Sequence, residues 1–257
     1  MKAVILAAGR GKRLSALTKN VPKTLVEVGG SPILAHILTN LRIFGIKDIV
    51  IITGYKAAKI REFVSKFSER MKINVSYIHN ERFNETNNIY SVYLARDQLE
   101  DEKFVLINSD VLFHGEILRS LLKSEKSGLI LSVDFRENLG DEEMKVKIEE
   151  DRIVEISKEI DPKDADGEYI GITRIDEKFS SEFFDAVKRT IKINGVNVFY
   201  ESAYQRMIDE GKHLTFESTR GLPWIEIDTY EDLQVARKLV APRIYSSSSS
   251  VKRDNKF

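Results

Sequence analysis

The sequence predicts an α/β protein with a doubly wound, Rossmann-like, mainly parallel sheet and a smaller mixed-sheet half. Short apolar segments alternate with amphipathic segments between Ala3 and Asp110, which is typical of strands that are each followed by a helix. Two of the apolar segments end in polar or charged residues, at the edge where open α/β sheets bind ligands. From Gly128 onward the apolar segments are shorter and polar turns separate them, which predicts a mixed sheet.

In the first half, the strands are predicted from short apolar runs and the helices from apolar residues spaced three and four apart. The predicted strands are 3–7, 48–53, 73–78 and 104–107, and the predicted helices are 32–45, 57–67 and 89–99. Gly45 follows the first helix at the position where glycine commonly ends one. The order of these segments is that of a parallel sheet with helical crossovers.

In the second half, the pattern predicts shorter strands and longer helices. The predicted strands are 129–135, 144–148, 153–157, 171–175 and 225–227, and the predicted helices lie near 180–191, 199–210 and 229–240. Thr229 is a candidate N-cap for the last helix. The Ser-rich segment that begins at Tyr245 is of low complexity, and we expect a disordered tail or linker there.

The composition excludes several classes of function. Lys and Arg number 40 and Asp and Glu number 40, so no net charge favours nucleic acid or an anionic membrane. The absence of cysteine excludes disulfides, thiolate catalysis and cysteine-based zinc sites, and the four histidines lack metal-ligand spacing. No apolar stretch approaches the ~20 residues that span a bilayer, and no signal peptide is recognisable. We therefore expect a cytoplasmic protein.

The segment Leu6–Leu14, LAAGRGKRL, joins an apolar strand to two glycines and three cations. Glycine lets backbone N–H groups approach an anion closely, and Lys12 and Arg13 add positive charge. Lys23, after a proline, can fold back over the same place. A dinucleotide-binding fingerprint needs glycine at Leu14, and a Walker A loop also does not match. The alternatives are a phosphate site and a tight turn with solvated cations.

Acidic residues follow two other predicted strands. Asp110 ends the apolar run FVLI in the sequence NSD, where a carboxylate can hold Mg²⁺ or end the strand as a turn. Glu226 and Asp228 alternate with isoleucines, so they share one face of a strand. Neighbouring carboxylates repel unless a cation lies between them. A magnesium site is one interpretation, and a solvated strand face or a helix cap by Asp228 is the other.

The spaced pattern A-x-x-L-A-A-G-x-G-x-R-L, followed by P-K-x-L, resembles the signature of the sugar-phosphate nucleotidyltransferase family. It reads here from Ala3 to Leu25, and the resemblance extends over roughly residues 1–240. It implies one nucleotidyltransferase domain over 1–241, with a nucleotide-binding half at about 1–127, an acceptor and metal half at about 128–241, and a tail at 242–257. The implied reaction joins a nucleoside triphosphate to a phosphomonoester and releases pyrophosphate, without a protein nucleophile.

The segment Asn87-Asn88-Ile-Tyr90-Ser91 resembles the choline-phosphate and inositol-phosphate cytidylyltransferase-like branch of that family. It implies CTP as the nucleotide, although Asn87 is also a candidate helix cap. The branch tends to have Asp-x-Asp at the metal strand, where this chain has Asn108-Ser109-Asp110. Phosphocholine, inositol phosphate, an amino-alcohol phosphate and a sugar 1-phosphate stay open as acceptors. A sugar-1-phosphate nucleotidyltransferase using UTP, dTTP or GTP and a catalytically silent nucleotide-binding module are the alternative functions.

The residues and the resemblance together give a set of expected site residues. Catalysis is assigned to Arg13 and Lys23. Nucleotide binding is assigned to Leu6, Ala7, Ala8, Gly9, Gly11, Lys12, Asn80, Asn87, Asn88, Ser91 and Asp110. Acceptor binding is assigned to Tyr90, Lys145, Lys158, Glu168 and Trp224, and a Mg²⁺ ion to Asp110, Glu226 and Asp228. The expected partners are CTP and a small phosphomonoester, with no nucleic acid and no membrane segment, and a homodimer is left open.

Overall fold

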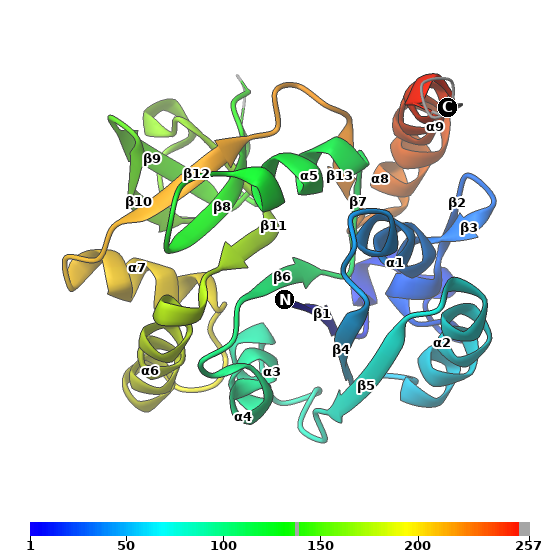
Figure 1. The fold of residues 1–257 in the computed structure, drawn as a ribbon, viewed down its shortest axis with the longest axis horizontal. Helices are drawn as coiled ribbons and strands as arrows, with labels where there is room; N and C mark the ends of the chain where they lie inside the picture. Colours follow the sequence, from blue (N-terminus) through cyan, green and yellow to red (C-terminus); the bar gives the residue numbers. More distant parts are fainter. Residues whose placement is uncertain (137–138, 252–257) are drawn as a thin grey trace.

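The computed structural model describes residues 1–136 and 139–251, and its main feature is one nine-stranded sheet. The strand order is β5-β4-β1-β6-β11-β8-β12-β10-β9 (Figure 1). The first four strands in this order are parallel, and the rest of the sheet is mixed. This confirms the predicted α/β class. The mixed part is not a separate sheet, because β11 (Gly167–Ile175) pairs with both β6 (Phe104–Asn108) and β8 (Leu129–Asp134).

The parallel end of the sheet is covered by helices on both faces. Its further strands are β1 (Lys2–Ala7), β4 (Asp48–Thr53) and β5 (Asn74–His79), and its helices are α1 (Ile33–Ile43), α2 (Ala57–Met71), α3 (Asn88–Leu94) and α4 (Arg96–Leu99). Successive side chains of a strand point to opposite faces. Thus Ile5 packs in one core with α1 and α2, whereas Val4 packs in a second core with α3 and α4. The two cores explain why β1 is apolar along nearly its whole length.

The mixed end carries longer connections between its strands. It contains β9 (Lys145–Glu149), β10 (Arg152–Ser157), β12 (Leu214–Ser218), α5 (Gly115–Lys123), α6 (Glu177–Asn194) and α7 (Glu201–Asp209). The sequence pattern did not predict α5 or β12. Short elements complete the chain: 3₁₀ helices η1 (Lys12–Leu17), η2 (Lys23–Leu25) and η3 (Pro162–Asp164), and strands β2 (Glu27–Val28) and β3 (Ser31–Pro32).

A small two-stranded sheet brings two distant segments of the chain together. Strand β7 (Val111–Phe113) pairs antiparallel with β13 (Trp224–Glu226), with Glu226 opposite Val111. The backbone N–H of Ile227 donates to the carbonyl of Asp110 at 3.0 Å. The pairing therefore places Asp110, which follows β6, beside Glu226 and Asp228 at the end of β13.

The C-terminal helices return to the first half of the molecule. They are α8 (Tyr230–Val235), the π-helical turn η4 (Ala236–Val240) and α9 (Ala241–Val251) (Figure 1). Ala241 and Ile244 are buried in the core that contains α1. This corrects the predicted tail at 242–257, because α9 is helical to Val251, and 252–257 lie outside the described residues. Pro242, which lacks a backbone N–H, is the second residue of α9 and follows the π-helical turn closely.

Among the described residues, no helix combines the length and apolarity needed to cross a membrane.

Candidate active site

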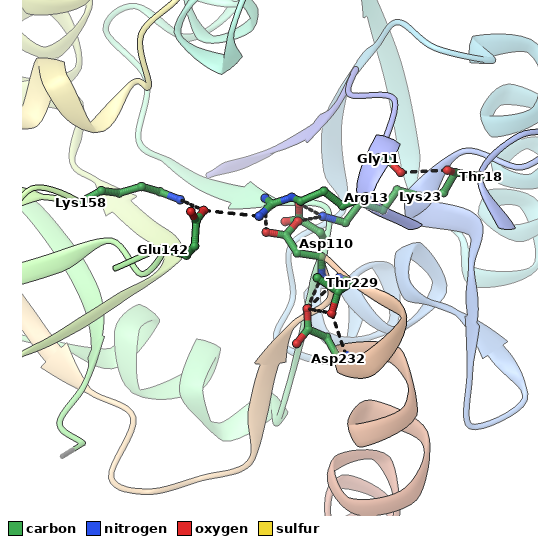
Figure 2. Close-up of polar contacts among 10 residues, drawn as sticks. Gly11, Arg13, Thr18, Lys23, Asp110, Glu142, Lys158, Thr229 and Asp232 are labelled. Atoms are coloured by element: carbon green, nitrogen blue, oxygen red, sulfur yellow. Dashed lines mark hydrogen bonds and ion pairs between the residues drawn. The ribbon is translucent and has the colours of Figure 1, made fainter. Parts of the chain in front are cut away.

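The loop after β1 forms one wall of a cavity of about 560 Å³. Gly11 has a φ of 60°, in the left-handed region that glycine adopts readily. A Cβ atom at Gly11 would lie 2.8 Å from the Cβ of Lys23, so glycine also allows the loop to pack against that lysine. The hydroxyl of Thr18 donates to the carbonyl of Gly11 at 2.8 Å, which holds the loop in place (Figure 2).

Lys23 lies at the centre of the charged groups in this cavity. Its Nζ donates to Asp110 Oδ2 at 2.8 Å and also forms an ion pair with Asp228 (Figure 2). Burial opposes the charge on Lys23, but attraction to the two carboxylates outweighs burial and raises its pKa above the usual value. Arg13 forms a second ion pair with Asp228. Two cations from the N-terminal segment thus meet acids from two distant strand ends.

Asp110, Glu226 and Asp228 form a cluster whose carboxylate oxygens lie within 4.8 Å of one another. Glu226 lines the cavity. Desolvation by the surrounding protein, together with the charges of Asp110 and Asp228, raises the pKa of Glu226 to about 8. A cation bound beside Glu226 would offset this repulsion and stabilise its ionised form. Three carboxylates are also the oxygen ligands that Mg²⁺ prefers, so the cluster fits that ion.

The last segment of the site is held by a capping box. Asp232 Oδ2 accepts hydrogen bonds from the backbone N–H groups of Asp228 and Thr229, at 3.0 and 2.7 Å, and the Thr229 hydroxyl accepts from the N–H of Asp232 (Figure 2). Thr229 is therefore the N-cap that the sequence predicts. The box fixes the backbone of Asp228 at the point where β13 turns into α8.

The asparagines predicted for nucleotide binding also line the cavity. Asn80 is 1% exposed, and its Nδ2 donates to the hydroxyls of Ser91, at 3.1 Å, and Thr86, at 3.2 Å. Asn87 accepts from the N–H of Asn88 as the N-cap of α3, which confirms that expectation. The Asn88 side chain accepts from the N–H of Tyr200 and thereby links α3 to the mixed half.

Most of the predicted site residues line this one cavity. They are Leu6, Ala7, Ala8, Gly9, Gly11, Lys12, Arg13, Lys23, Asn80, Asn87, Asn88, Ser91, Asp110, Lys158, Glu226 and Asp228. Their convergence joins segments from both halves of the sequence.

Four residues expected to bind the acceptor lie outside the lining of the cavity. The Lys145 assignment is corrected: its side chain is buried and its Nζ donates to the carbonyls of Gly140, Asp141 and Glu143 at 3.0 to 3.3 Å. Lys145 therefore holds the loop before β9.

The other three are Tyr90, Glu168 and Trp224. The ring of Tyr90 stacks on Tyr93, with centroids 6.2 Å apart, and faces Arg82. Glu168 forms an ion pair with Arg136, whose guanidinium also lies 5.5 Å from the centre of the Trp224 ring. Desolvation raises the pKa of Glu168 to about 7, although Arg136 opposes this effect. These contacts are with residues that are also outside the lining of the cavity.

Two acidic residues of the cavity are not predicted from the sequence. Glu142 lies 3.5 Å from Arg13 and 3.7 Å from Lys158, so it bridges the two halves of the site (Figure 2). Glu201, the first residue of α7, lines the cavity and is 4% exposed. A glutamate at the start of a helix is so common that its position alone carries no functional signal.

The chain is similar to several known proteins. A family model described as nucleotidyl transferase matches residues 2–138. The chain is 26% identical, over 257 aligned residues, to the CTP:phosphoglutamine cytidylyltransferase of Campylobacter jejuni, covering 91% of this chain and 98% of that protein. It is 31% identical, over 242 residues, to the bifunctional IPC transferase and DIPP synthase of Aquifex aeolicus, covering 92% of this chain and about half, 51%, of that longer protein.

Solved structures show a similar fold. The inositol-1-phosphate CTP transferase from T. maritima superposes with a TM-score of 0.75 and 24% identity, covering 93% of this chain and 97% of that one. At this level of identity the likeness establishes the architecture alone.

Proposed function

This chain belongs to the nucleotidyl transferase family and is a nucleotidyltransferase enzyme, and from this premise we propose that it is a Mg²⁺-dependent cytidylyltransferase. It would join CTP to a small phosphomonoester and release pyrophosphate. The observation that carries the proposal is the meeting of Arg13 and Lys23 with Asp110, Glu226 and Asp228 beside the glycine loop. This arrangement provides cations for a triphosphate and carboxylates for its metal ion in one cavity.

The proposed reaction is an in-line displacement at the α-phosphorus of CTP. An oxygen of the acceptor phosphate forms a bond to this phosphorus while the bond to the β-phosphate oxygen breaks, and the electron pair leaves with pyrophosphate. Arg13 and Lys23 bind the phosphate oxygens and stabilise their developing charge. The glycine loop offers backbone N–H groups, and Lys158 holds the acceptor phosphate. Mg²⁺, held by Asp110, Glu226 and Asp228, would neutralise the charge of the leaving pyrophosphate.

The choice of CTP depends on observations other than those that indicate the type of reaction. It rests on the Asn87–Ser91 segment, on Asn80 in the same wall, and on the names of the two relatives described above. A sugar-1-phosphate nucleotidyltransferase that uses UTP, dTTP or GTP is the alternative. Nothing in the described residues specifically favours that alternative, and a silent nucleotide-binding module is opposed by the full set of charged residues in the cavity.

A pyrophosphate-release assay tests this proposal. The purified chain, with Mg²⁺, is incubated with each of CTP, UTP, dTTP and GTP and with phosphocholine, phosphoethanolamine, inositol 1-phosphate or a sugar 1-phosphate. We expect release with CTP and at least one acceptor, and its loss when EDTA is added. A preference for another nucleotide contradicts the cytidylyltransferase assignment, and no release in any mixture contradicts turnover itself.

Glu142 gives a further prediction, because its carboxylate lies between two cations that are proposed to bind phosphates. We expect Glu142→Gln to lower the KM for CTP or for the acceptor, because the phosphate no longer competes with an internal anion. Exposed ion pairs contribute little, so the change should be about two- to fivefold. Steady-state kinetics measure it.

Glu125→Gln, the same substitution at an exposed position without a recorded ion pair among the described residues, is the control and should leave both KM values unchanged. A higher KM in Glu142→Gln shows instead that Glu142 assists binding.

A further inference from the structure

One end of the cavity is formed by the start of α7 and by neighbouring aromatic side chains. Phe199, Tyr169 and Met144 line it together with Glu201. The Glu201 side chain is buried, and its Oε2 has no hydrogen-bond partner among the described residues. Burial raises the pKa of Glu201 to about 7, against the smaller opposing effects of its own N–H and of Tyr200. A buried carboxylate oxygen without a donor is costly, and a ligand that supplies one removes that cost.

The hydroxyls of two tyrosines at this end, Tyr169 and Tyr200, already have partners. The hydroxyl of Tyr169 contacts Thr173 Oγ1 at 2.6 Å and the hydroxyl of Tyr200 at 2.8 Å. Tyr200 in turn donates to Asn108 Oδ1 at 3.3 Å. A polyol has several hydroxyls that each need a donor or an acceptor, and these satisfied groups offer few. The unpartnered Oε2 of Glu201 instead suits a ligand that carries one group with several N–H donors.

The charges at this end require a positive group on the ligand. Lys158 lies 5.2 Å from the centre of the Phe199 ring, and it is already near Glu142, at 3.7 Å. Lys158 shares Glu142 with Arg13, which lies 3.5 Å from the same carboxylate, and Glu201 forms no ion pair among the described residues. A phosphomonoester brings about 1.5 to 2 further negative charges. A cation on the acceptor compensates for this excess.

We propose that the acceptor is a small phosphomonoester that carries a protonated primary or secondary amine, whose N–H groups donate to Glu201. This inference rests on the proposed function and specifies its acceptor. A quaternary ammonium has no N–H group to donate, and it is bound best by a box of ring faces. The rings of Tyr169, Tyr200 and Tyr204 pack edge-to-face on one another, with centroids 5.4 to 6.5 Å apart, so they do not form an open box.

Acceptor kinetics test this proposal. With the wild-type chain, CTP and Mg²⁺, we expect kcat/KM for phosphoethanolamine to exceed that for phosphocholine and inositol 1-phosphate by roughly 10- to 100-fold, the range of one charged hydrogen bond. Glu201→Gln should remove most of this preference by raising the KM for phosphoethanolamine, with the KM for CTP unchanged. The control Glu177→Gln makes the same substitution at the first residue of α6, which is exposed and outside the cavity, and should keep the preference.

The possible outcomes separate this inference from the proposed function. Turnover that favours inositol 1-phosphate or phosphocholine overturns the amine assignment and leaves the cytidylyltransferase intact. If Glu201→Gln loses turnover equally with every acceptor, or changes the KM for CTP, Glu201 has a structural role. Either result also overturns the amine assignment. Because the comparison of acceptors uses the wild-type chain, it remains decisive if Glu201→Gln fails to fold. No pyrophosphate release with any acceptor refutes the proposed function, and the inference with it.

Discussion

Replacing Lys23 with alanine is expected to lower kcat by about 10²- to 10³-fold, the usual effect of removing one preorganised charged donor from a transition state. Lys23 is the group that touches both Asp110 and Asp228, and its raised pKa keeps it positive at every pH at which the enzyme is assayed. A developing negative charge on the α-phosphate is therefore stabilised without a proton transfer from Lys23. Turnover is measured as pyrophosphate release at saturating CTP and Mg²⁺.

The fold should survive this substitution, because Lys23 borders a cavity and packs in no apolar core. Circular dichroism and the Tm, measured with Mg²⁺ present to offset the repulsion of the freed carboxylates, check this point. Lys19→Ala, an exposed lysine four residues earlier, is the matched control and should retain full turnover. Wild-type kcat in a folded Lys23→Ala enzyme is inconsistent with a catalytic role.

Asp228→Asn is expected to produce the second large loss, of about 10²-fold or more in kcat at saturating Mg²⁺. The change removes one negative ligand from the three-carboxylate cluster and also weakens the ion pairs that position Arg13 and Lys23. The Mg²⁺ concentration that gives half-maximal activity should therefore rise as well. A Mg²⁺ titration of pyrophosphate release measures both effects, and they distinguish a metal ligand from a residue that only orients the cations.

Glu231→Gln serves as the control for Asp228→Asn, because Glu231 is exposed in the first turn of α8 and lies outside the cavity. Its activity and its Mg²⁺ requirement should equal those of the wild type. If Asp228→Asn lowers kcat without altering the Mg²⁺ requirement, Asp228 acts through Arg13 and Lys23 rather than as a ligand.

The sequence predicts the parallel half of the fold well, because three of its four strands, β1, β4 and β6, are buried on both faces. Asp48–Thr53 has the bounds that its apolar run indicates, and Lys2–Ala7 differs by one residue. The missed β12 reads LTFES, and only Leu214 in it is fully buried, so its apolar signal is weak. Strand β7 has three residues and exists because β13 pairs with it, which a local pattern does not reveal.

The composition of the C-terminal segment predicts a disordered tail, whereas the structure has a helix to Val251. A run of serines is typical of a linker, but Ile244 just before it is buried, and the hydroxyl of Tyr245 contacts His36 at about 3 Å. These two anchors continue the helix through a segment whose own helix propensity is modest.

The motif predicted the side of the cavity that we propose binds phosphate, because that side depends on local backbone and on a fixed spacing between Gly11 and Lys23. The acceptor side depends on which distant groups satisfy each side chain. Lys145 and Lys158 look alike in sequence, yet the first is bound by three backbone carbonyls and the second lines the cavity. Glu201 is also invisible in sequence, because only the folded structure shows that its Oε2 is buried without a hydrogen-bond partner among the described residues.

We propose that the cations of the first loop and the acids of two strand ends bind one metal-bound triphosphate. Anomalous diffraction from a crystal of this chain grown with CTP and Mn²⁺ as a substitute for Mg²⁺ tests it most directly. We expect a Mn²⁺ peak within coordination distance, about 2 to 2.3 Å, of Asp110 and Asp228, with the triphosphate beside Arg13 and Lys23. A nucleotide bound with its phosphates away from these cations, or a Mn²⁺ ion that Asp110 and Asp228 do not contact, contradicts the account.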